Sequence, residues 1–530
     1  MDLIDCSKEI RLLFNEYDRL RGLSAKECAA SFWDAVVFSV CDKAQREAFH
    51  EHIARFKQSA TIPLVDYLAI EDVPQYKMGS GGATMHVLNE LSSIWGQENL
   101  MSRKVLLIHT GGQSRRLPQH SALGKLFARL PLPLEKKHFK ETGNSNASNP
   151  KGDLSSFNCS VGTMLDLKLA MYLPFCRKMT SGVFLTASDD IEIYAIDGNF
   201  KVNASGFTAL AHPSPLEVAR GHGVYVLPEL VYPICINTPC LRVLQKPSMD
   251  EMNRQQAVLA ESFAYTDSAF AFGADVVKAL ISYYQQHLPL NEEICAYRDF
   301  LTCLGKKAPK ATKQLQQMLQ KFELSIIVLP QSIFYHIGTL AEYLDHLCSD
   351  LLFKKQLGLD AGSSVRIHSS LPATGPQSAG RYILEFCDFS KVAKLVLGRD
   401  CVLYGCQGQA EELQIPDSVV MFTVAVKSRE GLKSSDSGYV TLCFGINDDL
   451  KSSSKLFGRT DVGTCLWNAN LFRVASTRSE SLVTTLQDIK QPIVGGVNRY
   501  SMEDVLKHKC ISEMLDFQAT LVSHINMVQS

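Results

Sequence analysis

The segment from residue 105 to residue 125 holds the side chains best suited to phosphate chemistry. An apolar run ends just before the pair Gly111-Gly112, and three cations follow at defined offsets, Arg115, Arg116 and Lys125. A glycine turn presents backbone N–H groups without a hindering Cβ, and arginine and lysine add charge-assisted contacts to phosphate oxygens. We therefore expect this loop to bind a nucleotide through Gly111, Gly112, Gln113, Ser114 and Arg115.

A second glycine cluster lies upstream, in the sequence KMGSGGAT that ends at Thr84. A stretch with helical spacing follows directly, and a loop that opens a helix turns free N–H groups and the positive end of the helix dipole toward an anion. We expect Gly79, Gly81, Gly82 and Thr84 to contact the nucleotide. The same glycines would also suit an ordinary tight turn, and neither loop has the Walker pattern or the dinucleotide fingerprint.

Asp189 follows an expected buried strand that ends at Ala187. Carboxylates at the C-terminal ends of parallel strands lie where α/β sheets bind ligands, and one carboxylate with phosphate oxygens suits Mg²⁺. An Asp-Asp pair at this place is also an ordinary turn or helix cap. Lys246, followed by Pro247 at the end of another expected strand, is a candidate ligand for a second phosphate.

Composition and charge narrow the class of ligand. The chain has 530 residues, 46% of them hydrophobic, and a formal net charge of −1, so no broad basic surface favours nucleic acid or an anionic membrane. Its sixteen cysteines include no CxxC pair. No signal-peptide pattern opens the chain, and no apolar run reaches the roughly 20 residues that span a bilayer. We expect a cytoplasmic protein with reduced thiols and a small anionic ligand.

Hydrophobic periodicity divides the chain into regions. Residues 1–31 have helical spacing and predict a helix pair for packing or for oligomer contact. Residues 32–345 alternate strand and helix patterns, which favours an α/β, Rossmann-like domain with a mostly parallel mixed sheet. Within it, the polar stretch 135–160 is predicted to be a flexible insertion. Residues 446–530 are expected to be a mixed, partly helical segment, with Ser501 and Asp504 capping a helix.

Residues 346–445 show a different period. Leu397 and Leu403 are six positions apart, and so are Leu413, Val419 and Ala425. Six-residue spacing with glycine or proline at the corners is typical of a parallel β-helix, so we expect a short left-handed parallel β-helix-like domain. A small β-sandwich is the alternative.

Taken in order, these pieces resemble the sugar-1-phosphate nucleotidyltransferases. The family pattern of glycine turn, Arg-Leu, lysine, strand-end aspartate, Lys-Pro and Gly-Thr is matched by Gly111-Gly112, Arg116-Leu117, Lys125, Asp189, Lys246-Pro247 and Gly338-Thr339. The stretches GSGGATMHVL, LLIHTGGQSRRLPQHSALGKLF, ASDDIEIY and GFTALAHPSPL are most similar to the fucose-specific branch of that family. The resemblance implies transfer of GMP from GTP to L-fucose 1-phosphate, with pyrophosphate as the second product.

The resemblance also implies a role for each matched residue. On the family's pattern, Arg116 holds the β- and γ-phosphates, Lys125 neutralises the α-phosphoryl oxygens, and Lys246 grips the sugar phosphate. Asp189 holds Mg²⁺, the one implied cofactor. For the sugar substrate, the residues that we expect to bind are His212, His222, Gly223, Asp267 and His336, although a lone loop histidine is more often structural.

Three departures from the family's pattern stand out. Ser114 takes the place of the usual third glycine, and Arg115 the place of a common threonine. His336 stands where many relatives carry an aspartate that binds a second metal, and imidazole is a poor Mg²⁺ ligand. Asp267 or Asp299 could replace the missing ligand.

Two other functional classes stay open from the sequence. One is a sugar-1-phosphate nucleotidyltransferase with another base or sugar, such as a uridylyltransferase or a mannose-1-phosphate guanylyltransferase. The other is a catalytically silent regulatory relative. Retention of Arg116, Lys125, Asp189 and Lys246 argues against silence, since a silent relative has no electrostatic reason to keep four charges in one site. The sequence does not indicate an oligomeric state.

Overall fold

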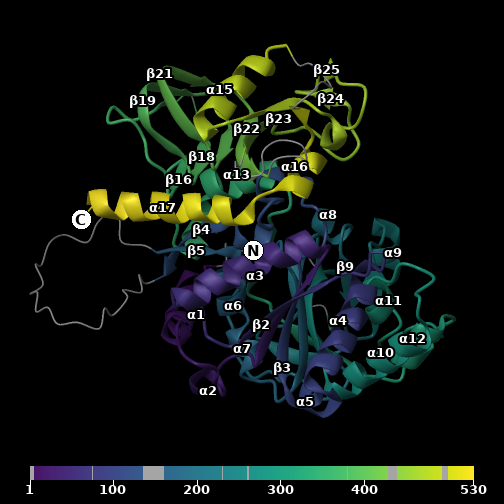
Figure 1. Ribbon diagram of the computed structural model, residues 1–530. Coiled ribbons are helices and arrows are strands. Elements are labelled where there is room, and N and C mark those ends of the chain that lie inside the picture. Colours follow the sequence, from purple (N-terminus) through teal and green to yellow (C-terminus); the bar gives the residue numbers. More distant parts are fainter. Residues whose placement is uncertain are drawn as a thin grey trace, which may run out of the picture.

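The protein consists of an α/β unit built on a large sheet and a smaller unit formed by strands from the last third of the chain (Figure 1). The computed structural model describes residues 5–74, 76–134, 160–229, 231–259, 262–378, 380–427, 438–491 and 499–529. Among these residues, no helix is long and apolar enough to cross a membrane.

One mixed sheet organises the α/β unit. In order across the sheet, its strands are β10 (Ile236–Pro239), β14 (Leu324–Val328), β8 (Phe207–Pro215), β13 (Phe263–Phe272), β6 (Gly182–Ala187), β3 (Lys104–His109), β1 (Ala35–Val40) and β2 (Asp66–Glu71). Three short strands extend this sheet. β9 (Gly223–Val226) and β12 (Val258–Leu259) pair with β13, and β11 (Arg242–Gln245) pairs with β9. The run β2-β1-β3-β6 is parallel, whereas β13 is antiparallel to both β6 and β8. The expected α/β fold with a mixed sheet is confirmed, but the sheet is parallel mainly in this half.

Helices cover both faces of the sheet. They are α1 (Ser7–Leu20), α2 (Ala25–Cys28), α3 (Lys43–Gln58), α4 (Gly79–Trp95), α5 (Gln97–Ser102), α6 (Met164–Met171), α7 (Leu173–Cys176), α8 (Leu216–Ala219), α9 (Met249–Arg254), α10 (Ala274–Gln286), α11 (Arg298–Leu301), α12 (Gln314–Leu319), α13 (Leu340–Cys348) and α14 (Leu351–Leu357), with the short turns η1 (Pro118–His120) and η2 (Lys125–Phe127). Successive side chains of a strand point to opposite faces. Phe38 and Leu106 therefore enter one core with α3 and α6, while Val37 and Leu107 enter another with α4 and α10.

Two further strand pairs lie beside the sheet. β7 (Asp190–Tyr194) pairs antiparallel with β15 (Ser332–His336), and β4 (Arg129–Leu134) pairs with β5 (Ser160–Thr163). The insertion predicted for 135–160 falls, up to residue 159, outside the described residues. The helix pair predicted within 1–31 is α1 and the short α2. α1 packs against α6 and α14 of the same chain and donates the Tyr17 hydroxyl to Asp166 at 2.7 Å.

The smaller unit begins with alternating strands of two sheets. They are β16 (Val365–Ile367), β17 (Gln377–Ser378), β18 (Tyr382–Glu385), β19 (Asp388–Leu397), β20 (Cys401–Tyr404), β21 (Gln407–Ile415) and β22 (Val419–Val426). Then come β23 (Gly438–Gly445), β24 (Lys455–Leu456), β25 (Thr460–Asp461), η3 (Leu466–Asn468), β26 (Phe472–Ala475), α15 (Arg478–Asp488), β27 (Arg499–Tyr500), α16 (Met502–His508) and α17 (Ile511–Gln529). As the sequence predicts, Ser501 and Asp504 form a capping box at α16.

Parallel partners in these two sheets are 18 or 19 residues apart. Tyr382 lies opposite Cys401, and Val402 lies opposite Val420. The left-handed backbone conformation recurs at a similar interval, as at Asp400 and Ser418. Such parallel pairing agrees with the six-residue spacing, but β22 and β23 pair antiparallel and end the repeat. The left-handed β-helix itself stays a prediction.

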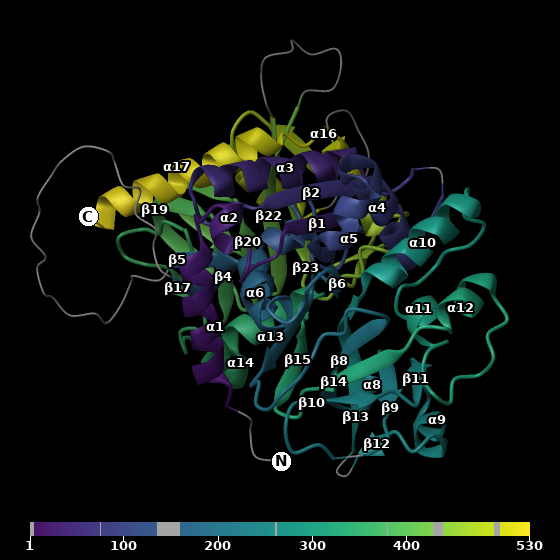
Figure 2. The ribbon, with the colours of Figure 1, turned by 90° about the horizontal axis from the view of Figure 1, so that it is seen from below.

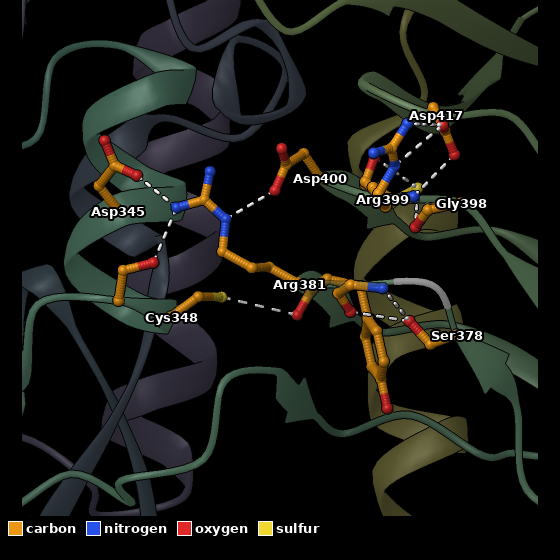
Figure 3. Close-up of polar contacts among 12 residues, drawn as sticks. Asp345, Cys348, Ser378, Arg381, Gly398, Arg399, Asp400 and Asp417 are labelled. Atoms are coloured by element: carbon orange, nitrogen blue, oxygen red, sulfur yellow. Dashed lines mark hydrogen bonds and ion pairs between the residues drawn. The ribbon is translucent and has the colours of Figure 1, made fainter.

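Ion pairs join the turns that precede successive parallel strands (Figure 3). Arg399 contacts Asp417 at 3.0 Å, and Arg381 contacts Asp400 at 2.6 Å. Arg381 also reaches Asp345 of α13 at 2.5 Å, and so ties the smaller unit to the α/β unit. Exposed ion pairs of this kind contribute about 0–1 kcal/mol each to the free energy of unfolding. We therefore expect them to fix the register of the strands and the contact between the units rather than to stabilise the fold.

A buried polar cluster joins the two units more firmly. Glu385 of β18 accepts the backbone N–H of Arg129 at 3.2 Å and the Tyr343 hydroxyl at 3.1 Å, and lies 3.6 Å from Nε2 of His120 in η1. Burial raises the pKa of Glu385 to about 7 and lowers the pKa of His120 to about 3. His120 is therefore neutral at pH 7, and its contact with Glu385 is not an ion pair.

The C-terminal helix α17 lies along α3 at the boundary between the units (Figures 1 and 2). Asp516 of α17 contacts Arg55 of α3 at 2.7 Å. Just before α17, the ammonium group of Lys509 donates to the backbone oxygen of Ala122 at 2.8 Å. The smaller unit therefore supports the loop between β3 and η2.

Replacing Glu385 with glutamine is expected to flatten the pH dependence of unfolding between about pH 5 and pH 7. The pKa of the folded carboxyl is about 7 against an ordinary value of 4.5, so the folded state holds the extra proton in this window. The unfolding free energy contributed by Glu385 therefore falls as the pH rises, by at most about 3 kcal/mol. Urea unfolding across this pH window measures the slope.

Glu412→Gln is the matched control, because Glu412 is exposed in a surface pair with Lys394. This variant should keep the wild-type slope. An equal slope in Glu385→Gln and in the wild type would contradict the burial of a protonated carboxyl at this joint.

Candidate active site

The predicted phosphate loop and Asp189 meet at one edge of the sheet. β3 and β6 are parallel neighbours, with His109 opposite Ala187, so the segments that follow them leave from the same edge. The ammonium group of Lys125 lies 2.5 Å from Oδ2 of Asp189, and each side chain is 18% exposed. The structure therefore brings together the lysine and the aspartate that the sequence singles out separately.

His336 completes this group from a third segment. Its Nε2 lies 3.3 Å from Oδ2 of Asp189, and its Nδ1 lies 3.3 Å from Glu342 of α13. A Cβ on Gly338 would lie 2.1 Å from Cε1 of His336, so the glycine leaves the space that the ring needs. The Gly338-Thr339 step also begins α13, where Thr339 and Glu342 form a capping box.

Opposite charges stabilise the ionised forms in this group. Burial alone would raise the pKa of Asp189, but hydrogen bonds from His336 and Lys125 outweigh it and hold this pKa well below its usual range. The hydrogen bonds to Asp189 and Glu342 raise the pKa of His336 to about 9, so the imidazole is a cation at pH 7. Asp189 thus faces two cations before any ligand binds.

A second polar layer lies beneath Asp189. Burial raises the pKa of the neighbouring Asp190 to about 7. Deeper, Lys168 lies 3.6 Å from Glu192, which also accepts the Tyr172 hydroxyl at 2.6 Å. These side chains are almost fully buried, so they hold β7 in place rather than meet a substrate.

A second charged group forms where β9 and β13 meet. Asp267 accepts the backbone N–H of Gly223 at 2.9 Å, and a Cβ on Gly223 would lie 2.2 Å from Oδ2 of Asp267. Burial raises the pKa of Asp267 to about 6. His222 lies 3.9 Å from Asp267, and the exposed Lys246 donates its backbone N–H to the carbonyl oxygen of His222 at 2.9 Å.

The structure places two predicted candidates away from direct contact with a ligand. His212 is 0% exposed, and its two ring nitrogens contact the hydroxyls of Ser332 and Ser268 at 2.9 and 2.8 Å. Asp299, an expected replacement metal ligand, accepts the N–H of Cys295 at 2.7 Å and pairs with Arg298 at 2.8 Å. Asp299 therefore holds the start of α11 and not a metal.

The upstream glycine cluster also differs from the prediction. Residues 79–84 form the first turns of α4 itself, and Gly81 and Gly82 donate their N–H groups to the carbonyl oxygen of Ile294 at 2.7 and 3.4 Å. A Cβ on Gly79 would lie 2.3 Å from that oxygen. Thr84 is buried and bonds to Ser80. These glycines allow a close approach of the Ile294 backbone, and the N–H groups of Gly81 and Gly82, which were expected to bind an anion, already have a partner.

The loop from 111 to 116 is open to solvent and braced from the smaller unit. Ser114 adopts a φ of 48°, the conformation that the family's glycine would favour. The Arg115 guanidinium contacts Gln113 at 2.7 Å and lies 5.0 Å from the ring centroid of Trp467. Arg116 is exposed, as are Gly111, Gly112 and Gln113.

Sequence reasoning missed Trp467 and Asp72. Asp72 directly follows β2, and the position of a Cβ on Gly111 lies 3.8 Å from its Oδ2. Burial raises the pKa of Asp72 to about 6. The strand-end rule that singles out Asp189 would also have found Asp72, whereas no sequence pattern connects Trp467 with the loop.

The sequence is also similar to known proteins, which is evidence independent of this geometry. A family model, the fucose pyrophosphorylase domain, matches residues 97–477. The chain is 30% identical to the fucose-1-phosphate guanylyltransferase of Mus musculus over 96% of both chains, and 30% identical to its namesake in Homo sapiens over 94% of this chain and 92% of that one. It is 24% identical to the bifunctional fucokinase/GDP-fucose pyrophosphorylase of Arabidopsis thaliana, over 85% of this chain and 47% of that protein.

His336 is expected to titrate with a pKa of about 9 in the metal-free protein, because Asp189 and Glu342 stabilise its cation. Asp189→Asn should lower this pKa toward the ordinary value of 6.5, by more than Glu342→Gln does. Nitrogen-15 NMR of labelled histidine measures the titration, with His336→Gln to assign the signal.

His86 of α4, whose pKa is lowered by burial, is the internal control and should titrate alike in all variants. A wild-type His336 that titrates near 6.5 would contradict the geometry around Asp189.

Proposed function

We propose that this chain, which belongs to the fucose pyrophosphorylase family, transfers the GMP unit of GTP to L-fucose 1-phosphate and releases pyrophosphate. The names of its relatives support the reaction. In this chain, the main structural support is the contact between Lys125 and Asp189. It lies at the carboxyl edge of parallel strands, where α/β sheets bind ligands.

In the proposed reaction, an oxygen of the sugar phosphate attacks the α-phosphorus of GTP. The bond from that phosphorus to the bridging oxygen breaks, and pyrophosphate leaves with the electron pair. No group on the protein needs to become covalently attached, so the chain contributes position and charge. Lys125 and Asp189 lie at the centre of this arrangement.

Each cation has a proposed share of the negative charge. Lys125 moves from Asp189 to the α-phosphoryl oxygens, and the exposed Arg116 binds the β- and γ-phosphates. Arg115, braced by Trp467, lines the same loop. Lys246 grips the sugar phosphate. Burial lowers the pKa of the adjacent His222, and the charges of His336 and Lys246 lower it further.

We also propose that Asp189 holds Mg²⁺. A partly exposed carboxylate at a strand end fits this ion, which commonly takes one or two protein carboxylates while phosphates and water supply the rest. When bound, the ion would neutralise charge on the phosphate oxygens. The position of a second metal ligand in many relatives is taken by His336, and imidazole is a poor Mg²⁺ ligand, so we propose no second metal.

Cytoplasmic location and a short left-handed β-helix are parts of the same proposal. The cysteines that the structure describes are all free thiols, which suits a reducing compartment. The parallel strands of the smaller unit recur every 18 or 19 residues, as three six-residue sides of a coil would.

Two alternative functions use parts of the same site differently. A mannose-1-phosphate guanylyltransferase or a uridylyltransferase would use the same charges, and differs in the base and sugar pockets. A silent regulatory relative would not need Lys125 and Asp189 in contact, or the cationic loop that they anchor.

A substrate panel tests the proposal. Each nucleoside triphosphate is offered with Mg²⁺ and with L-fucose 1-phosphate, mannose 1-phosphate or N-acetylglucosamine 1-phosphate, while pyrophosphate release is measured. We expect GTP with L-fucose 1-phosphate to be turned over best. Lys125→Met should lower that rate by more than about 100-fold because the α-phosphoryl charge loses its partner.

Lys394→Met is the matched control, since Lys394 pairs with Glu412 on the surface of the smaller unit, and it should keep the wild-type rate. Best turnover with UTP would overturn the guanylyl assignment. Absence of pyrophosphate with every pair would overturn the enzyme assignment.

A further inference from the structure

One face of β15 connects the two charged groups of the site. Alternate residues of a strand share a face, so Ser332, Phe334 and His336 point to the same side. Ser332 contacts His212 at 2.9 Å, and His336 contacts Asp189 at 3.3 Å. Phe334 lies between these two residues on the strand.

The ring of Phe334 also faces the second charged group. Its centroid is 5.1 Å from the ring of His222, with the two planes nearly perpendicular at 78°, and 6.0 Å from the ring of His212. His222 in turn neighbours Asp267 and Lys246. Phe334 is half-buried, so part of its ring is covered and part stays accessible. It is an apolar surface set between charged and polar side chains.

We propose that Phe334 is a specificity-determining residue that contacts the methyl group of a 6-deoxyhexose 1-phosphate. This inference rests on the proposed function and names the feature of the sugar that the site selects. L-Fucose carries a methyl group where L-galactose carries a hydroxymethyl group. His336 contacts Asp189, and Phe334 faces His222, which accepts the backbone N–H of Lys246, so a sugar phosphate held between Asp189 and Lys246 would place its ring close to Phe334.

The physical basis is the cost of placing a hydroxyl against carbon. A methyl group covers the aromatic ring without losing a hydrogen bond, whereas a hydroxyl must leave water and find a new partner. Of the two histidines whose rings face Phe334, His212 offers no partner, because its two nitrogens already contact Ser332 and Ser268. Apolar pockets reject an added hydroxyl by roughly 10- to 100-fold, which is the preference we expect.

A purely structural role predicts a different result. Phe334 lies opposite Glu192 in the β7–β15 ladder and on the same face, so its ring is placed to cover the buried pair of Glu192 and Lys168. Loss of that cover alone would lower turnover of both sugars by the same factor. The ratio of the two kcat/KM values is therefore the informative quantity.

The experiment measures kcat/KM for L-fucose 1-phosphate and for L-galactose 1-phosphate, each with GTP. Phe334→Tyr keeps the aromatic ring over Glu192 and Lys168, and adds a hydroxyl that can form a hydrogen bond with the extra hydroxyl of L-galactose 1-phosphate. Phe334→Asn removes the apolar surface. We expect the wild type to prefer fucose, and both variants to lose at least about fivefold of that preference. The KM for GTP should stay unchanged.

Phe457→Tyr is the matched control, since Phe457 is a half-buried phenylalanine of the smaller unit, and it should keep the wild-type preference. A preference unchanged in Phe334→Tyr, or a wild type that uses both sugars equally, would overturn the inference and leave the proposed function standing. A wild type that turns over neither sugar with any nucleoside triphosphate would overturn both.

Discussion

The site depends on one carboxylate oxygen. Oδ2 of Asp189 contacts both Lys125 and His336, which come from a loop after β3 and from the end of β15. This contact requires that β3 and β6 end at the same edge of the sheet, and that Gly338 leave room for the imidazole. Asp189 already faces two cations. On the proposed function, a phosphate that binds here would take Lys125 over from Asp189.

Sequence patterns predicted those parts of the site that come together because two parallel strands are neighbours in the sheet. An apolar strand followed by glycine and cations, and another followed by Asp189, meet because parallel neighbours share an edge. The same reasoning failed at Gly79 and Gly81, where the deciding partner is the carbonyl of Ile294, far away in the sequence. Glycines that make room for a backbone and glycines that cradle an anion have the same appearance in a sequence.

The smaller unit contributes to the site in ways that no sequence pattern could have indicated. Trp467 braces Arg115, Lys509 holds the carbonyl of Ala122, and Glu385 closes a buried cluster against His120. One hydrophobic core runs from the first face of the large sheet into these strands and α17. The six-residue spacing predicted parallel strands in this region, but contacts between the units arise from packing of whole elements. The domain boundary predicted near residue 345 is therefore crossed by contacts that support the candidate site.

We propose that Lys125 and Asp189 act as one unit on the reacting phosphate. A double-mutant cycle with Lys125→Met and Asp189→Asn, read as kcat/KM for GTP and L-fucose 1-phosphate, tests it most directly. We predict that the double variant is little less active than the less active of the two single variants. The coupling free energy between the two side chains is then at least about 2 kcal/mol. Losses that simply multiply would contradict the account, because the two side chains would then act independently.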